Sequence, residues 1–177
     1  EKGWDENKLD FFRRHIVQLG RSGLFVVYDE LVGKEPVEWN YLLHTVELPM
    51  EVAEEKDGLR ILGKNKADGV SIAHLFSSQK MTYAQTDTFF VAAVDWKKRL
   101  GKTLSNHYHF TATTASCSKI CFLNVIDVHG NNRADAVINR ERNRITVEEW
   151  VIECNLEGEG NAFLYIENKQ NGVSLDF

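Results

Sequence analysis

Two histidines separated by a single residue, His107 and His109, form a candidate polar site. Side chains alternate between the two faces of a β-strand, so this spacing places both imidazoles on one face. Thr111 and Thr113 continue that face, which makes it the polar one. Some zinc sites use such a histidine pair, but no H-x-x-E or C-x-x-C motif supplies a third ligand nearby. We expect no metal here and favour solvated histidines, with contact to a sugar as the alternative.

Asp29 and His44 are ionisable residues inside two apolar runs, 24–32 and 37–46, which a Gly-Lys-Glu-Pro stretch separates. A buried carboxylate is costly unless it is paired. If the runs form a hairpin around that stretch, Asp29 faces Asn40, and His44 lies about 13 Å away along the same face. We therefore predict a structural polar core of Asp29 and Asn40, with a backbone group or an arginine as other possible partners of Asp29, and no bond between Asp29 and His44.

A third candidate is Trp96, which precedes Lys97, Lys98 and Arg99. An exposed tryptophan can stack on a sugar ring, and the basic residues would attract an anionic polysaccharide. The surrounding stretch, 87–104, fits either a strand or a helix by its period. A solvated loop is the alternative interpretation. Together with His107 and His109, the residues Trp96, Lys97 and Lys98 are the predicted substrate-binding set.

The remaining motifs predict no catalytic residue, no metal site and no cofactor. Phosphate-binding loops, nucleophile elbows and H-E-x-x-H motifs are absent from the sequence. Cys117 and Cys121 would lie about 13 Å apart on one strand, too far for a disulfide. With Cys154 the cysteines number three, a poor disulfide framework, so we expect small apolar core residues.

The composition is that of one globular domain, residues 1–177, with 43% hydrophobic and 27% charged residues. The net charge of −5 argues against a nucleic-acid partner, and no apolar run is long enough to span a bilayer. Short apolar runs with frequent turn signals predict an all-β fold, an antiparallel two-sheet β-sandwich of about a dozen strands. The expected strands are 11–19, 24–32, 37–46, 59–63, 69–76, 81–84, 107–114, 120–128, 134–139, 145–153, 162–167 and 173–177.

Four of these strands together resemble a known family. They read FFRRHIVQL, LFVVYDELV, WNYLLHT and, much later, CFLNVIDVHG. The order resembles the C-terminal β-sandwich of heparinase II/III-like polysaccharide lyases. In that family an arginine-flanked strand precedes a strand ending in aspartate, a strand ending in Leu-Leu-His follows, and another apolar strand lies far downstream.

The resemblance implies part of a periplasmic or extracellular enzyme that cleaves acidic polysaccharides, such as glycosaminoglycans, by β-elimination. The family's H-x-D-x-G-S-F and H-N-t stretches are absent here, so no catalytic or metal residue transfers to this chain. We expect a non-catalytic C-terminal domain that is inactive alone, buttresses an N-terminal helical toroid and lines the substrate cleft. A stand-alone carbohydrate-binding module and a scaffold without sugar contact are the alternatives.

A domain that packs on a larger partner should also expose apolar side chains. Phe11 and Phe12 point to opposite faces of one expected strand, as do Phe89 and Phe90 in the ambiguous stretch. One member of each pair, or Trp4, is therefore expected to be exposed.

Overall fold

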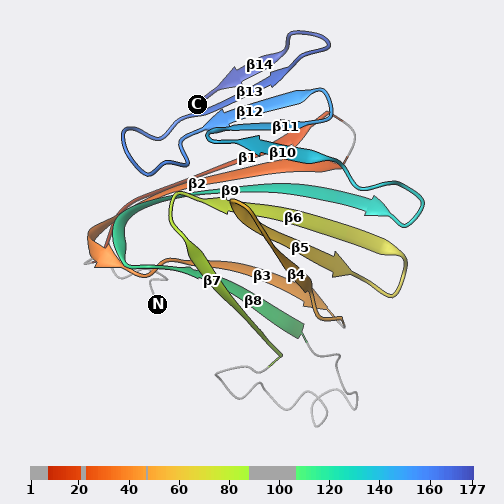
Figure 1. Ribbon diagram of the computed structural model, residues 1–177, viewed down its shortest axis with the longest axis horizontal. Helices are drawn as coiled ribbons and strands as arrows, with labels where there is room; N and C mark the ends of the chain where they lie inside the picture. The colour runs from red at the N-terminus through yellow and green to blue at the C-terminus, as the bar shows by residue number, and fades with distance from the viewer. Residues whose placement is uncertain (1–7, 21–22, 47, 88–106) are drawn as a thin grey trace, which may run out of the picture.

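The fold is a sandwich of antiparallel β-sheets stacked in three layers (Figure 1). The computed structural model describes residues 8–20, 23–46, 48–87 and 107–177, and within them fourteen strands and no helix. The predicted all-β sandwich is thus confirmed, with its strands divided among three hydrogen-bonded sheets. No helix in these ranges is long and apolar enough to cross a membrane.

A six-stranded sheet forms the middle layer and consists, in spatial order, of β1 (Leu9–Leu19), β2 (Leu24–Val37), β9 (Cys117–Gly130), β6 (Gly69–Ser77), β5 (Gly58–Lys64) and β4 (Glu51–Glu55). A five-stranded sheet covers one face and consists of β10 (Ile138–Glu141), β11 (Arg144–Val147), β12 (Trp150–Cys154), β13 (Leu164–Asn168) and β14 (Ser174–Asp176). A three-stranded sheet covers the other and consists of β3 (Asn40–Val46), β8 (His107–Thr114) and β7 (Met81–Thr86).

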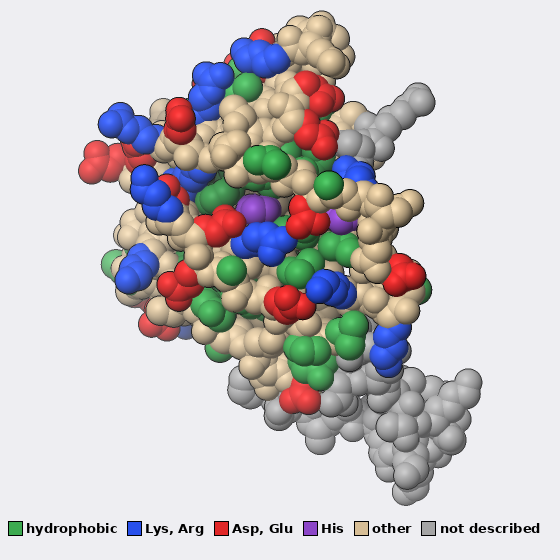
Figure 2. All heavy atoms as spheres, turned by 45° about the vertical axis from the view of Figure 1, so that its right-hand side comes forward, with side chains coloured by type: hydrophobic (Ala, Val, Ile, Leu, Met, Phe, Trp, Pro, Cys, Tyr) green, Lys and Arg blue, Asp and Glu red, His purple; other side chains and the backbone are tan. Residues whose placement is uncertain are grey.

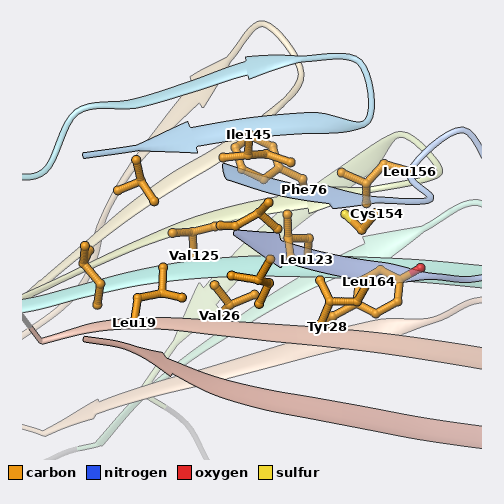
Figure 3. Packing of buried hydrophobic residues seen from close by; sticks show 14 of the residues in the cluster. Leu19, Val26, Tyr28, Phe76, Leu123, Val125, Ile145, Cys154, Leu156 and Leu164 are labelled. Carbon is orange, nitrogen blue, oxygen red and sulfur yellow. The ribbon is translucent and has the colours of Figure 1, made fainter. Parts of the chain in front are cut away.

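The first apolar core lies between the six-stranded and five-stranded sheets. Alternate residues of β2 and β9, such as Val26 and Leu123, point into it and are fully buried. Ile145 and Leu164 meet them from the opposite sheet (Figure 3). Burying such an aliphatic side chain contributes about 1.5–3 kcal/mol, so this core is a main source of stability.

The second core lies between the six-stranded and three-stranded sheets. It uses the other set of alternate residues, such as Phe122 on β9 and Leu75 on β6. Phe110 of β8 covers them and has no exposed surface. β9 is apolar on both faces because it contributes to both cores, as expected for a central strand.

The predicted hairpin between residues 24–32 and 37–46 is wrong. β2 continues to Val37 and pairs with β1 and β9, whereas β3 pairs with β8 in another sheet. The Gly-Lys-Glu-Pro stretch that predicted a turn is an irregularity in the β2–β9 register between Val32 and Val37. Such an irregularity bends a strand without ending it. The chain therefore passes from one sheet to the other at a corner.

Gly33 and Trp39 fix this corner. A Cβ at Gly33 would lie 2.8 Å from the carbonyl oxygen of Glu35, so the bend leaves no room for a side chain there. The Trp39 backbone N–H donates to Thr114 Oγ1 at 3.2 Å, and its indole Nε1 donates to the Cys117 carbonyl at 2.9 Å. Trp39 thereby joins the β2–β3 crossing to the β8–β9 crossing, where the chain returns to the six-stranded sheet.

The aromatic and cysteine predictions are confirmed where they can be followed. Phe12 is exposed while Phe11 is half-buried. Trp4, Phe89 and Phe90 lie outside the described residues. The cysteines Cys117, Cys121 and Cys154 are all free thiols. Cys121 and Cys154 fill space in the first core, and burial raises the pKa of both.

Candidate functional site

The outer face of the three-stranded sheet carries three histidines. His107 and His109 lie on β8, on the face opposite the buried Phe110, as their spacing predicts. His44 of β3 lies directly across from His109. The two imidazole rings meet edge to face, with centroids 4.6 Å apart. Sequence reasoning missed His44 as a member of this group because it placed 37–46 beside 24–32 instead of beside β8.

The three imidazoles influence one another electrostatically. The pKa of His44 lies below its ordinary value, first because burial disfavours the charged form and then because His109 and His107 repel a proton there. His44 therefore resists protonation when no anion is present. A bound carboxylate or sulfate would remove that resistance. Among the described residues, no group of three or more His, Cys, Asp or Glu side chains is placed to hold a metal ion.

Hydroxyl groups continue this polar surface along the sheet. Thr111 and Thr113 lie on the same face of β8 as the histidines, and the Thr113 hydroxyl donates to Asn40 Oδ1 at 2.7 Å. Threonines and imidazoles both donate and accept hydrogen bonds, which is the chemistry that sugar hydroxyls require. The other members of the predicted set, Trp96, Lys97 and Lys98, lie outside the described residues.

Asp29 is buried as predicted, but Asn40 is not its partner. Asp29 is 2% exposed, and both of its oxygens accept from Arg14 on the neighbouring strand at 2.6 Å. Asn40 is exposed and belongs to the three-stranded sheet. The predicted pairing fails because the chain changes sheets between these two residues. The arginine alternative is correct, and His44 does not bond to Asp29.

A second buried carboxylate, Asp127, was not anticipated from the sequence. It is 1% exposed and accepts from the Arg133 side chain and from the Ala136 backbone N–H, the latter at 2.8 Å. His129 donates from Nδ1 to the Gly130 carbonyl, and its Nε2 lies 3.7 Å from Asp127 Oδ2. These groups attach the 131–137 segment to the end of β9.

The cluster extends across the sheet through Asp135. His129 Nε2 lies 3.3 Å from Asp135 Oδ1, and Arg60 of β5 donates to Asp135 Oδ2 at 2.9 Å. Two guanidinium groups thus already neutralise the two carboxylates, Asp127 and Asp135, which makes a cation site electrostatically unfavourable. Figure 2 shows the same combination of charges on one face of the molecule, where histidines lie among both acidic and basic side chains. We interpret the cluster as structural.

Comparison with known proteins gives one informative result. No protein-family model matches the chain, and no curated protein matches it. Among solved structures, one titled heparinase III, BT4657 gene product, matches with a TM-score of 0.50 and 11% identity, over 88% of this chain and 22% of that one. A second structure of that protein, with methylated lysines, matches with a TM-score of 0.50 and 13% identity, over 98% of this chain and 24% of that one.

The chain shares the fold of part of heparinase III. The predicted likeness to heparinase-like lyases is thus confirmed at the level of the fold. The match with heparinase III covers almost all of this chain but less than a quarter of the longer one. Nearly the whole three-sheet arrangement therefore has a counterpart in heparinase III, while most of heparinase III has none here.

Proposed function

We propose that this chain is a non-catalytic β-sandwich domain of a heparinase-like polysaccharide lyase, which cleaves acidic polysaccharides by β-elimination. In this role it buttresses the catalytic part and lines the substrate cleft, in the periplasm or outside the cell. The observation that carries the proposal is the shared fold with heparinase III over 98% of this chain and 24% of that one. A sandwich that corresponds to so small a part of a lyase is suited to a supporting role.

The outer face of the three-stranded sheet is the surface we assign to the cleft. His44, His107 and His109 can pair with uronate or sulfate groups once protonated, and the threonines beside them can bond sugar hydroxyls. The lowered pKa of His44 means that a proton is taken up when an anion binds. Affinity for an acidic polysaccharide should therefore rise as the pH falls.

Heparin binding by the chain tests this assignment. We expect retention on immobilised heparin to be stronger at about pH 5.5 than at about pH 7.5, on either side of the ordinary histidine pKa. The double variant His44→Gln/His109→Gln should lose most of this difference. His15→Gln is the matched control, because His15 lies on β1 and packs against Phe177. Retention that is absent at both pH values would exclude cleft lining and leave the scaffold role.

Activity provides a separate test of the non-catalytic role. β-Elimination creates an unsaturated uronate that absorbs ultraviolet light, so product formation can be followed directly. The chain alone should form no product from heparin, heparan sulfate or alginate. Sustained product formation would overturn the non-catalytic assignment. Specific, pH-dependent binding without any larger lyase in the producing organism would support a stand-alone carbohydrate-binding module instead.

A further inference from the structure

A groove of about 460 Å³ opens where the three sheets meet. Its walls are the turn between β4 and β5, residues 55–58, and the connection between β6 and β7, residues 77–81, which lie side by side in Figure 1. Arg140 of β10 reaches it from the five-stranded sheet. The volume falls in the range of small-molecule sites, about 300–1,000 Å³.

Arg140 is held rigidly beside this groove. Its Nη1 donates to the Asp57 carbonyl at 2.7 Å, and its Nε donates to the Arg142 carbonyl at 2.8 Å. The guanidinium also lies over the Phe76 ring, 5.1 Å from the centroid. Burial lowers the pKa of Arg140, and the negative charges of Asp57 and Glu157 offset this only in part. A fixed, half-buried cation of this kind favours an anionic group in the groove.

The other charged groups of the groove are both acidic and basic. Lys56 and Lys80 bring ammonium groups, whereas Glu54 and Asp57 bring carboxylates. Within the described residues, none of these four side chains forms an ion pair. Glu55, by contrast, is engaged with His74 at 3.2 Å. The groove thus offers cationic donors and carboxylate acceptors at the same time.

We propose that this groove binds a short saccharide bearing one acidic group, with the acid at Arg140 and Lys80 and the sugar hydroxyls at Glu54 and Asp57. A multiply charged phosphate ligand would be repelled by the carboxylates, and a neutral sugar would form no ion pair with the Arg140 guanidinium. A uronic acid satisfies both kinds of group. This site is distinct from the histidine face and does not depend on the chain being part of a lyase.

The test compares two monosaccharide probes, glucuronate and glucose, in titrations followed by amide chemical shifts of the whole chain. Glucuronate should shift residues 54–58 and 77–81 and bind more tightly than glucose. Lys80→Gln and Arg140→Lys should each weaken glucuronate binding about threefold to tenfold, as expected for a lost charge-assisted hydrogen bond. Glu54→Gln should weaken the binding of both sugars. Lys169→Gln is the control, because this exposed lysine lines no part of the groove.

The outcomes separate this site from the proposed lyase role. Arg140 supports two backbone segments, so Lys80→Gln and Glu54→Gln keep the test valid if the Arg140 variant folds poorly. Equal shifts with both sugars, shifts confined to other residues, or unchanged binding in Lys80→Gln and Glu54→Gln would overturn the groove assignment. The variant His44→Gln/His109→Gln should lose heparin retention but keep glucuronate binding, so either proposal can fail alone.

Discussion

The two faces of the six-stranded sheet each bury one carboxylate, but they hold it in different ways. Asp29 faces the three-stranded sheet and is 2% exposed, and Asp127 faces the five-stranded sheet and is 1% exposed. Asp29 is bonded through both oxygens to one arginine on the adjacent strand. Asp127 accepts hydrogen bonds from an arginine and a backbone N–H, and His129 Nε2 lies 3.7 Å from one of its oxygens. One carboxylate therefore depends on a single partner, whereas the other is part of a network.

The difference follows from what each carboxylate connects. Arg14 and Asp29 are direct cross-strand neighbours, so their pairing reinforces a ladder that backbone hydrogen bonds already define. Asp127 holds Arg133 and Ala136, which belong to a segment outside the strands. That segment has few backbone bonds of its own, so several side chains share the task of attaching it to the sheet.

The largest effect is expected from Arg14→Ala. This change leaves the buried Asp29 carboxylate with no charged partner. Removing one member of a fully buried pair costs about 3–5 kcal/mol, and the loss here should lie at or below the lower end of that range, because the Arg14 side chain is 45% exposed. The free energy of unfolding in urea measures the loss. Arg13→Ala is the matched control, because Arg13 lies on the opposite face of the same strand and is exposed. A loss for Arg14→Ala no greater than that for Arg13→Ala would show that Asp29 does not depend on this pair.

A smaller effect is expected from Arg133→Ala. Asp127 would keep its bond from the Ala136 N–H and the neighbouring imidazole of His129. The loss should be about 1.5–3 kcal/mol, the range for one hydrogen bond to a charged group. Urea unfolding of both arginine variants under the same conditions gives the comparison directly. If Arg133→Ala is the more destabilising variant, the remaining partners of Asp127 do not compensate for the lost arginine.

Much of the difference between the two buried carboxylates could not be predicted from the sequence. The apolar runs and turn signals predict most of the strands, and the isolated Asp29 in such a run predicts a buried carboxylate with a partner. The partner was uncertain because the Gly-Lys-Glu-Pro stretch has the composition of a hairpin turn, yet it forms a bend inside β2. Only the pairing of β3 with β8 brings His44 to His109. The Asp127 network depends on an irregular segment, for which periodicity gives no signal.

The buried tyrosines extend the comparison to weaker interactions. The Tyr41 hydroxyl accepts from Asn124 Nδ2 at 3.2 Å on the side of the three-stranded sheet, and Asn124 has no exposed surface. The Tyr28 hydroxyl donates to the Asn155 carbonyl at 3.3 Å on the other side. Tyr41→Phe should cost about 1–3 kcal/mol, because it leaves a buried amide without a partner.

Tyr28→Phe should cost less, about 0.5–1.5 kcal/mol, because it removes one long hydrogen bond to a backbone carbonyl. Both variants keep the aromatic ring in its core, so a difference between them reports the hydroxyl contacts. Thermal unfolding of the two variants beside the parent chain is sufficient to rank them. Equal losses would mean that the Asn124 amide finds another partner when the Tyr41 hydroxyl is removed.

The smallest effect is the pH dependence due to His44. Its pKa is lowered in the folded chain, chiefly by burial and then by repulsion from His109 and His107. The unfolded chain therefore binds this proton more readily, so the stability contributed at neutral pH is lost as the pH falls through the ordinary histidine pKa of about 6.5. The loss levels off below the folded pKa.

His44→Gln should lose less stability than the parent chain between about pH 7.5 and about pH 5.5. The same urea series with saturating heparin should narrow this difference, because an anion at the histidine face stabilises the protonated form. If the parent chain and His44→Gln show the same pH dependence without heparin, His44 is not electrostatically coupled to the other two histidines. If heparin leaves the difference between the two chains unchanged, the histidine face does not bind an acidic polysaccharide.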